Sequence, residues 1–564
     1  MSAGADRPAP GTSPAWGRWV LVALLTWLVG YPLLLTLASA FQQEGRTLLT
    51  GFTFEHFAEF ARRSDEWLAL WRSLWISLAS VVLSALVGIP LAFVFERTDF
   101  PGRRVIGALV ALPVALPPLV GVIAFLFLYG ESGFIPRGLI ALFDLDGPPW
   151  RLGGAGAILL VHTYSMYVYF YLFTRAALAR LDPALPEAAA ALGAGRARVL
   201  FRVTLPLLRP ALAGAALLTF MTSLASFSAP YIFGGGFRVM TTQIVASKRN
   251  GDLPMAQVET VALAALALVA LYLLRRIDPR DRLTGSVRGI APRPKALKST
   301  WARVGASVAG YGLALLLLLP HLTLILITFV PARTWTTEAF PPILSTANYA
   351  ALPGGPEGLK PVWNSLWMAA AATAVALALG LAAARGVVGR KGRAARWLEN
   401  LIALPWAVPG TVFALALATT FAVDAPLAGR FVLVGTPWLL PLAYVVRSIP
   451  LTGRASLAGL AQLDPALEEA AASLGAGRVA RLRRVVLPLV RPALVAGASL
   501  AFITSLGDFV TSIVLYTYDN RPISMAIDSI LRRDDLGLAA VYGVLLMVAS
   551  GAAFVLTRQG EEAP

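Results

Sequence analysis

Residues that could do chemistry are scarce in the long apolar stretches of this 564-residue sequence. Asp508 lies in the run Ser-Leu-Gly-Asp-Phe, and Ser226 takes its place in the similar run Ser-Leu-Ala-Ser-Phe. A charged side chain at the centre of a membrane span costs about 2.5 to 3.5 kcal/mol, so Asp508 is a candidate for holding or guiding a cation on a transport path. Ser226 and the tyrosine-flanked His162 are further candidates. The alternative for Asp508 is a hydrogen-bonded acid at a helix interface. The alternative for the region of His162 is an aromatic stripe that serves only for packing.

Motifs of catalysis do not accompany these residues. The sequence contains no G-x-x-x-x-G-K-[ST] nucleotide loop, no H-E-x-x-H and no G-x-S-x-G. It has no cysteine, and its three histidines, His56, His162 and His321, are far apart. We therefore expect no catalytic residue, no metal site and no cofactor in this chain, so uphill transport would need ATP hydrolysis by a separate subunit.

One long segment of the chain occurs twice in the sequence. Leu181–Leu212 reads LDPALPEAAAALGAGRARVLFRVTLPLLRPAL, and Leu463–Leu494 reads LDPALEEAAASLGAGRVARLRRVVLPLVRPAL, in register without a gap. The matched positions include Asp, Pro, Glu, Gly and Arg, so an apolar composition alone does not explain the similarity. The chain is a tandem duplication.

Each copy predicts a short helix followed by a sharp turn. Asp182 and Asp464 precede a proline, which suits an N-cap followed by the first helical position. Gly193 and Gly475 can end the helix in the left-handed conformation, and arginines follow. A short helix with small side chains can bind in a groove of another protein. The alternative is that the segment is only a solvated connector.

The spacing Glu-Ala-Ala, three residues, Gly resembles the EAA loop of bacterial ABC importer permeases. The matching residues are Glu187, Ala188, Ala189 and Gly193 in the first copy, and Glu469, Ala470, Ala471 and Gly475 in the second. In that family the loop is a coupling helix that sits in a cleft of the ATPase subunit. The resemblance therefore implies two copies of a partner ABC ATPase, which would carry the ATP and Mg.

Composition places the chain in a lipid bilayer. Hydrophobic residues make up 57% of it and charged residues 14%, and the mean hydropathy is +0.69. The net charge of +17 comes from basic residues between apolar runs, without an aromatic-interleaved basic patch, so we expect no nucleic-acid partner. The predicted spans are about 18–41, 68–95, 105–129, 153–178, 211–233, 258–274, 304–330, 362–386, 397–423, 431–446, 493–516 and 536–556.

These runs predict an all-α polytopic membrane protein of two tandem six-helix modules, with about 12 transmembrane helices. Excess Arg and Lys in the repeated loops and in the hinge between the halves place both on the cytoplasmic side, together with both termini. The predicted divisions are a disordered N-terminus (1–17), a first module (18–275), a basic linker (276–302), a second module (303–557) and a C-terminal tail (558–564).

Further matches support the duplication. Trp71–Trp75 corresponds to Trp363–Trp367, and the prolines that end with Pro117 correspond to those that end with Pro409. Such prolines predict kinks in the third and ninth spans. The loops 238–244 and 521–527 also correspond, and they could contact a binding protein outside or serve as plain connectors.

The whole pattern resembles the double-length type I permeases for ferric iron and thiamine. The resemblance implies a bacterial inner-membrane importer subunit, supplied by a periplasmic binding protein. The segments 226–236 and 250–253 look most like the ferric-iron branch. Thiamine, a polyamine or another small solute is the alternative substrate. A secondary transporter of the major-facilitator type is the alternative class, which the glycine-broken loops and the scarcity of paired membrane carboxylates disfavour.

Overall fold

The computed structural model describes residues 15–43, 50–115, 117–277, 295–296, 299–335, 338–355, 357–422, 427–428 and 431–562. Helices dominate this part of the chain, which confirms the predicted all-α class. Its strands are β1 (Thr98–Asp99) and β2 (Lys295–Ala296), which pair in parallel. Most of the predicted N-terminal segment 1–17 and of the predicted linker 276–302 lies outside the described residues.

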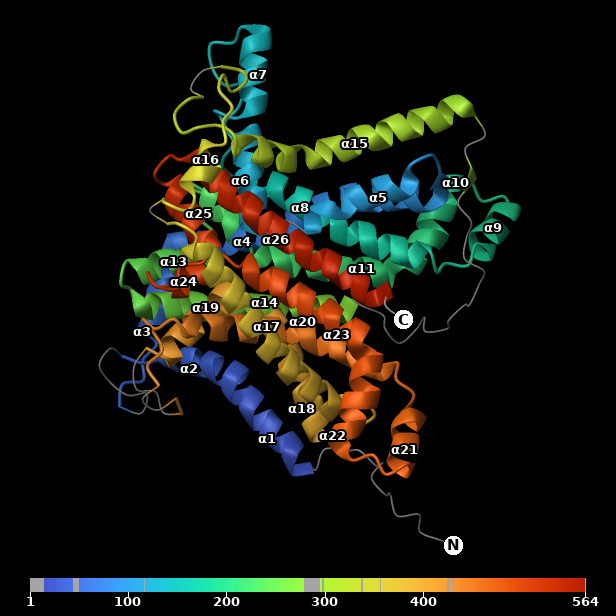
Figure 1. Cartoon of the computed structure of the whole chain (residues 1–564), viewed down its shortest axis with the longest axis vertical. Helices are drawn as coiled ribbons and strands as arrows, with labels where there is room; N and C mark the ends of the chain where they lie inside the picture. Colours follow the sequence, from blue (N-terminus) through green and yellow to red (C-terminus); the bar gives the residue numbers. More distant parts are fainter. Residues whose placement is uncertain are drawn as a thin grey trace. The chain divides into compact units, whose positions relative to one another are not determined.

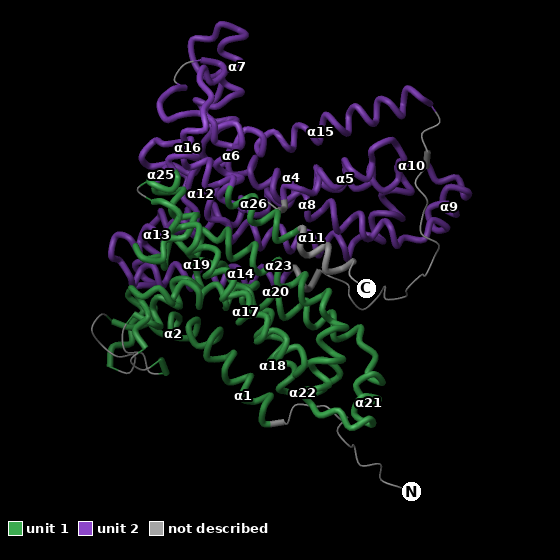
Figure 2. Tube along the Cα trace, viewed as in Figure 1, with its two compact units in different colours: residues 1–55, 352–529, 545–564 green, residues 56–351, 530–544 purple. Residues whose placement is uncertain are grey.

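The chain forms two compact units, which Figure 2 distinguishes by colour. Unit 1 comprises residues 1–55, 352–529 and 545–564, and unit 2 comprises residues 56–351 and 530–544. In chain order (Figure 1) the helices are α1 (Ala15–Leu25), η1 (Thr26–Gly30), α2 (Tyr31–Ser39), α3 (Glu55–Arg62), α4 (Ser64–Arg97), α5 (Arg103–Ala111), η2 (Leu112–Ala115), α6 (Pro118–Tyr129), α7 (Phe134–Phe143), α8 (Gly154–Leu178), α9 (Ala184–Ala191), α10 (Arg196–Val199), η3 (Leu200–Thr204), α11 (Leu205–Leu224), α12 (Ser228–Phe233), α13 (Met240–Arg249), α14 (Leu253–Ile277), α15 (Thr300–Ile327), α16 (Ala347–Ala351), α17 (Lys360–Val387), α18 (Arg393–Ala407), α19 (Gly410–Thr420), α20 (Leu439–Ala461), α21 (Pro465–Ser473), α22 (Arg478–Arg481), η4 (Leu482–Val486), α23 (Leu487–Leu506), α24 (Ser512–Leu515), α25 (Ile523–Leu531) and α26 (Leu536–Glu562).

The described residues contain 10 helical stretches that are long and apolar enough to span a membrane, or 11 when α18 and α19 count as one bent span. The bend between those two helices is 108° and falls just before Gly410, beside the predicted proline kink. The remaining predicted span, 431–446, overlaps only the first part of α20, which runs from Leu439 to Ala461. Arg447 and Arg454 lower the hydropathy of α20, which explains why it does not pass as an apolar span.

Each compact unit includes the first span of the other sequence half. In unit 1 the helices α1 and α2 pack with second-half elements, and the indole of Trp27 donates to the carbonyl of Leu427 (3.1 Å) and meets Phe421 edge to face. In unit 2 the second-half helix α15 packs beside α5 and α6, where the Tyr164 hydroxyl donates to the carbonyl of Leu317 (2.7 Å). Compact units and sequence halves therefore differ by this exchange of first spans, and residues 530–544 of the second half also belong to unit 2.

Two glycines let the main helices of each unit approach closely. A Cβ on Gly88 of α4 would lie 2.7 Å from the Cβ of Phe170 on α8, and it would also meet the carbonyl oxygen of Tyr167. At the matching place in unit 1, a Cβ on Gly380 of α17 would lie 2.7 Å from the backbone nitrogen of Gly453 on α20. The duplication has thus kept the same close helix crossing in both units.

The duplicated Trp-x-Ser-Leu-Trp motifs hold the loop that precedes a short helix. Ser73 accepts a hydrogen bond from the backbone N–H of Met240, the first residue of α13, at 2.8 Å. Ser365 does the same for Ile523, the first residue of α25, also at 2.8 Å. The motif serine therefore satisfies a helix N-terminus in each half, which the sequence match alone did not reveal.

The tyrosine stripe of α8 is a packing feature. Tyr167 donates its hydroxyl hydrogen bond to the carbonyl of Val110, and Tyr171 donates to that of Gly107 at 3.1 Å. Both carbonyls lie in α5, where the helix gives way to the 3₁₀ turn η2 and its Pro113. The stripe thus supplies hydrogen-bond donors beside a proline break, in agreement with the packing alternative.

Replacing Gly88 with alanine should destabilise the protein by about 1 to 3 kcal/mol, because the added methyl overpacks the α4–α8 crossing. The control is Gly121→Ala in α6, where a Cβ would meet no atom within 4 Å. Thermal unfolding of both variants in detergent, followed by size-exclusion chromatography, measures the difference. An equal change in melting temperature in the two variants would contradict this account of the crossing.

Candidate functional site

The two predicted coupling helices are exposed at the ends of longer helices. In unit 2, α9 joins α8 to α11, and in unit 1, α21 joins α20 to α23; Figure 1 shows each short helix beyond the ends of the pair that it connects. No residue of α9 or α21 is buried. Glu187 and Glu469 are both exposed. Both short helices therefore leave much of their surface exposed.

The start of α21 follows the sequence prediction, whereas α9 begins one residue later than predicted, at Ala184, with Pro183 before it. The carboxylate of Asp182 accepts a hydrogen bond from the backbone N–H of Ala184 at 2.9 Å. The carboxylate of Asp464 accepts one from Ala466, also at 2.9 Å, and Pro465 occupies the first helical position. Each aspartate thus satisfies a backbone donor that the helix itself leaves free.

Both short helices end in the same hydrogen-bonded turn. Gly193 has φ +82°, its N–H donates to the carbonyl of Ala190, and the next residue, Ala194, donates to Ala189, each at 3.0 Å. The second copy repeats these bonds around Gly475, which also has φ +82°. This is a Schellman motif, in which a glycine adopts the left-handed conformation at little cost. The left-handed backbone conformation therefore explains why a glycine stands at this position after Glu-Ala-Ala.

A wide helical turn leads from each loop into the next long helix. The π-helical segments η3 and η4 occupy matching positions in the two copies, and the N–H of Leu205 reaches the carbonyl of Leu200 across five residues. A proline follows directly, at Pro206 and at Pro488. Because proline has no N–H, the wider turn lets the chain enter the long helix without an ordinary i to i−4 bond.

A leucine beside each turn was missed by the sequence analysis. Leu192 and Leu474 precede the two glycines, and each is 89% exposed. One exposed apolar side chain needs no explanation, but two at the same position of a duplicated loop are typical of a contact with a partner. The signal was present in the sequence, since both copies read Leu-Gly at this point.

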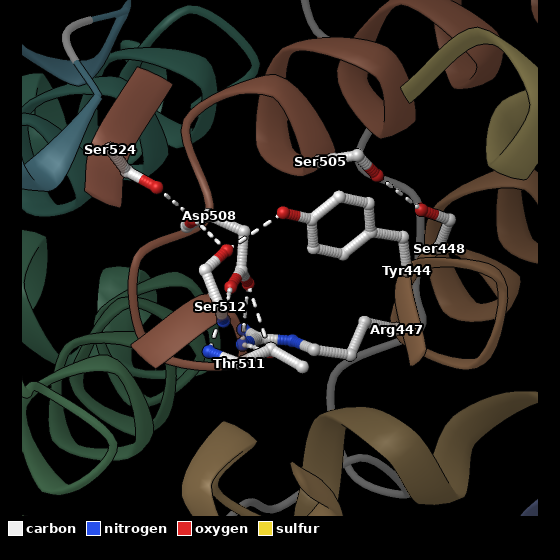
Figure 3. Close-up of polar contacts among 8 residues, drawn as sticks. All are labelled: Tyr444, Arg447, Ser448, Ser505, Asp508, Thr511, Ser512 and Ser524. Carbon is white, nitrogen blue, oxygen red and sulfur yellow. Dashed lines mark hydrogen bonds and ion pairs between the residues drawn. The ribbon is translucent and has the colours of Figure 1, made fainter. Parts of the chain in front are cut away.

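Asp508 lies in unit 1 with its carboxylate fully engaged (Figure 3). One oxygen accepts from the backbone N–H of Thr511 (2.7 Å) and of Ser512 (3.3 Å), at the start of α24. The other accepts from Arg447 (2.8 Å) and from the hydroxyl of Thr511 (3.1 Å). The side chain of Asp508 is 5% exposed and that of Arg447 is 25% exposed. This geometry is that of a helix cap joined to an ion pair.

His162 and Ser226 lie together in unit 2. Nε2 of His162 is 2.9 Å from the hydroxyl of Ser226, while Nδ1 is 2.9 Å from Ser80 and 3.1 Å from Ser223. The imidazole is 2% exposed, so both of its nitrogens are satisfied inside a cluster of serines. In the aligned repeats, Tyr444 of unit 1 stands where unit 2 has His162, and Asp508 stands where it has Ser226.

Arg447 was missed by the sequence analysis, although a signal existed. Its counterpart in the first repeat is Ser165, so the pair Ser165 and Ser226 is replaced by Arg447 and Asp508. Two buried acids in unit 2 were missed as well. Glu66 accepts from the side-chain amide of Gln243 at 3.0 Å, and Glu259 accepts from the hydroxyl of Ser247 at 2.6 Å.

The fold and the loops define an integral membrane transport protein, and sequence comparison gives its family. The model of the family "binding-protein-dependent transport system inner membrane component" matches residues 80–282 and, a second time, residues 376–559. These two matches cover more than half of the chain and coincide with the two copies of the duplication. The chain belongs to this family of permeases.

Individual relatives agree with that assignment. The probable ABC transporter permease protein y4fN of Sinorhizobium fredii is 32% identical over 546 residues, which is 96% of each chain. The ferric transport system permease protein FbpB of Actinobacillus pleuropneumoniae is 30% identical over 488 residues, covering 83% of this chain and 68% of the relative. The thiamine transport system permease protein ThiP of Brucella abortus is 31% identical over 295 residues, covering 50% of each. All three are named as permeases, and the names of the last two give different substrates, ferric iron and thiamine.

Gly193→Ala should loosen the end of α9, because a left-handed alanine costs roughly 1 to 2 kcal/mol. Gly195→Ala is the control, since Gly195 has φ −63° and ψ 159°, which alanine adopts freely. A Cβ at either position would meet nothing within 4 Å, so sterics do not confuse the comparison. Hydrogen exchange of the peptide 184–196 should accelerate in the first variant alone. Equal exchange in both would contradict the assigned turn.

Asp508→Asn should destabilise the protein by about 2 to 3 kcal/mol, less than the roughly 3 to 5 kcal/mol of a fully buried broken pair, since Arg447 is partly exposed. Replacing both residues by serine, as in the first repeat, should restore part of the loss. The control is Asp519→Asn, because the ion pair of Asp519 with Lys360 is exposed. Thermal unfolding of the variants gives the measurement. Normal stability of Asp508→Asn with a loss of uptake would instead indicate a role on the substrate path.

Proposed function

We propose that this chain is the membrane-spanning subunit of an ATP-driven ABC importer and that α9 and α21 receive force from two copies of a separate ATPase. Substrate arrives from a periplasmic binding protein, and ATP and Mg bind on the ATPase subunits. The chain lies in the bacterial inner membrane with both termini and both coupling helices in the cytoplasm. The observation that carries this proposal is the pair of corresponding, exposed, glycine-ended helices in a permease of the binding-protein-dependent family.

The residues that couple to the ATPase are the Glu-Ala-Ala and glycine positions of both loops. Glu187 and Glu469 present carboxylates on the exposed faces of α9 and α21. Ala188, Ala189, Ala470 and Ala471 keep these faces narrow, so that the helix fits a cleft. The exposed side chains of Leu192 and Leu474 add an apolar anchor, as interfaces commonly place an apolar contact beside charged ones.

Alternating access follows from the same arrangement. When the ATPase subunits close, they move both coupling helices, and each helix is joined through a π turn to a long helix, α11 or α23. A membrane bundle with two stable packings then exposes its path to one side or to the other. Asp508, Ser226 and His162 are the proposed path residues, and the saturated contacts of Asp508 make a structural role the competing proposal.

Ferric iron is the proposed substrate, with thiamine, a polyamine or another small solute by the same mechanism as alternatives. The support is the relative FbpB, which is named for ferric transport, and the segments 226–236 and 250–253. Among the described residues, no group of three or more His, Cys, Asp or Glu gathers as for a metal ion. The binding protein is therefore proposed to set the specificity. Membership of the permease family removes the major-facilitator alternative.

Glu187→Ala combined with Glu469→Ala should weaken attachment of the ATPase, because both docking faces lose a contact. Interface truncations that matter cost about 1 to 2 kcal/mol, which is roughly five- to thirtyfold in affinity. The control is Glu131→Ala, an exposed glutamate in the loop between α6 and α7. Co-purification from host membranes, with mass spectrometry of the bound chains, measures the loss.

Vesicles made from the same membranes test the transport step. When the binding protein and ATP are both supplied, uptake of labelled ferric iron should exceed uptake of labelled thiamine. Vanadate, which inhibits the ATPase, should stop the uptake. Uptake that is driven by an ion gradient alone, or unchanged ATPase attachment in the double variant, would overturn the proposal.

A further inference from the structure

The two coupling helices differ in how they are held by their own unit. In unit 1, Arg385 in the last turn of α17 donates to Glu468 in the first turn of α21, at 2.9 Å. Both side chains are about three-quarters buried, with exposures of 26% and 23%. A carboxylate at a helix N-terminus and a guanidinium at a helix C-terminus are each favoured by the helix dipole. The contact therefore joins two helix ends that suit one another electrostatically.

Glu468 also acts on one further arginine, Arg390. Burial and the positive charges of Arg18 and Arg385 lower the pKa of Arg390, and the carboxylate of Glu468 acts in the opposite direction. Arg18 lies in α1 and Arg390 lies in the turn after α17. Glu468 thus offsets guanidinium charge from α17 and from the turn after it. Its removal would leave those charges to repel each other.

The first copy is built differently at this point. Pro186 takes the place of Glu468 in the aligned repeat, and Phe93 takes the place of Arg385 when the two Trp-x-Ser-Leu-Trp motifs are aligned. The ion pair at that end of unit 2 is Arg175 with Glu96, at 3.3 Å, and it joins α8 to α4. Within the described part of the chain, α9 makes no ion pair.

We infer that Arg385 and Glu468 are positioning residues that clamp the second coupling helix to α17, whereas the first coupling helix is free to adjust its orientation. This inference rests on the proposed function of the two helices. The clamped helix passes the motion of its ATPase subunit directly to α17 and α23. The free helix adapts its angle to the other subunit, so the two docking sites of a symmetric ATPase pair are unequal on this chain.

Spin labels test the clamp on the permease alone. The chain has no cysteine, so Ser473→Cys in α21 and the matching Ala191→Cys in α9 can each carry one nitroxide. Both positions are exposed. In lipid nanodiscs the label on α21 should be less mobile than the label on α9. Arg385→Gln or Glu468→Gln should raise the mobile fraction on α21 about two- to fivefold, the range expected for loss of a partly exposed ion pair.

Controls separate the clamp from general damage. Arg175→Gln breaks the matched ion pair of unit 2, which touches no coupling helix, and should leave both labels unchanged. Exchanging the charges, Arg385→Glu with Glu468→Arg, should restore the immobile label only in part, because the exchanged charges oppose both helix dipoles. Equal mobility of the two labels in the wild type, or an unchanged label on α21 in Arg385→Gln, would overturn the inference.

A second readout uses the assembled importer. Releasing the clamp should lower the uptake per ATP hydrolysed while the ATPase remains attached, because the helix still docks but transmits less motion. If the variants change the label mobility but the wild type binds no ATPase, the clamp is supported and the proposed function is rejected. If the wild type binds the ATPase but the variants leave the label mobility unchanged, the proposed function is supported and the clamp is rejected.

Discussion

A backbone N–H or C=O that is set free inside a bilayer must find a partner within the protein, because lipid offers none. Several otherwise unrelated details of this chain meet that constraint. Tyr167 and Tyr171 donate to carbonyls beside a proline break. Ser73 and Ser365 accept the first N–H of a short helix. The π turns before the long helices serve the same end, since they carry the chain past a proline.

The duplication has preserved these backbone solutions and varied the charges placed on them. Where one repeat has Ser165 and Ser226, the other has Arg447 and Asp508. Buried charge is tolerated only when it is paired and hydrogen-bonded, so both members had to differ together. Pro186 and Glu468 differ in the same manner, together with Phe93 and Arg385. The two halves thus share their main-chain arrangement but differ in the charged side chains that they carry.

The membrane class, the duplication and the ends of the short helices could be predicted from the sequence, because each depends on local chemistry. Aspartate before proline and glycine after an alanine run determine a helix start and stop with little help from the rest of the fold. The proline bend before Gly410 was predictable for the same reason, although its angle of 108° was not.

Features that depend on distant contacts were not predictable. The predicted span 431–446 stops before Arg447, whereas α20 continues to Ala461, because the cost of Arg447 is offset by Asp508, which lies far along the chain. The sequence singled out Asp508 as a lone acid because its partner could not be known. Likewise, the exchange of first spans between the compact units arises from packing of residues hundreds of positions apart, which no local pattern encodes.

That exchange has a consequence for biosynthesis. Helices α1 and α2 leave the ribosome well before the rest of unit 1, which begins at residue 352. At about 5 to 20 residues per second, the wait is roughly 15 to 60 s. During this time the second-half helices that pack against α1 and α2 are missing, so lipid or an insertase must cover the packing faces of these two helices. Membrane insertion and tertiary assembly are therefore separate events for this part of the polypeptide, and α1 and α2 dock long after they have been made.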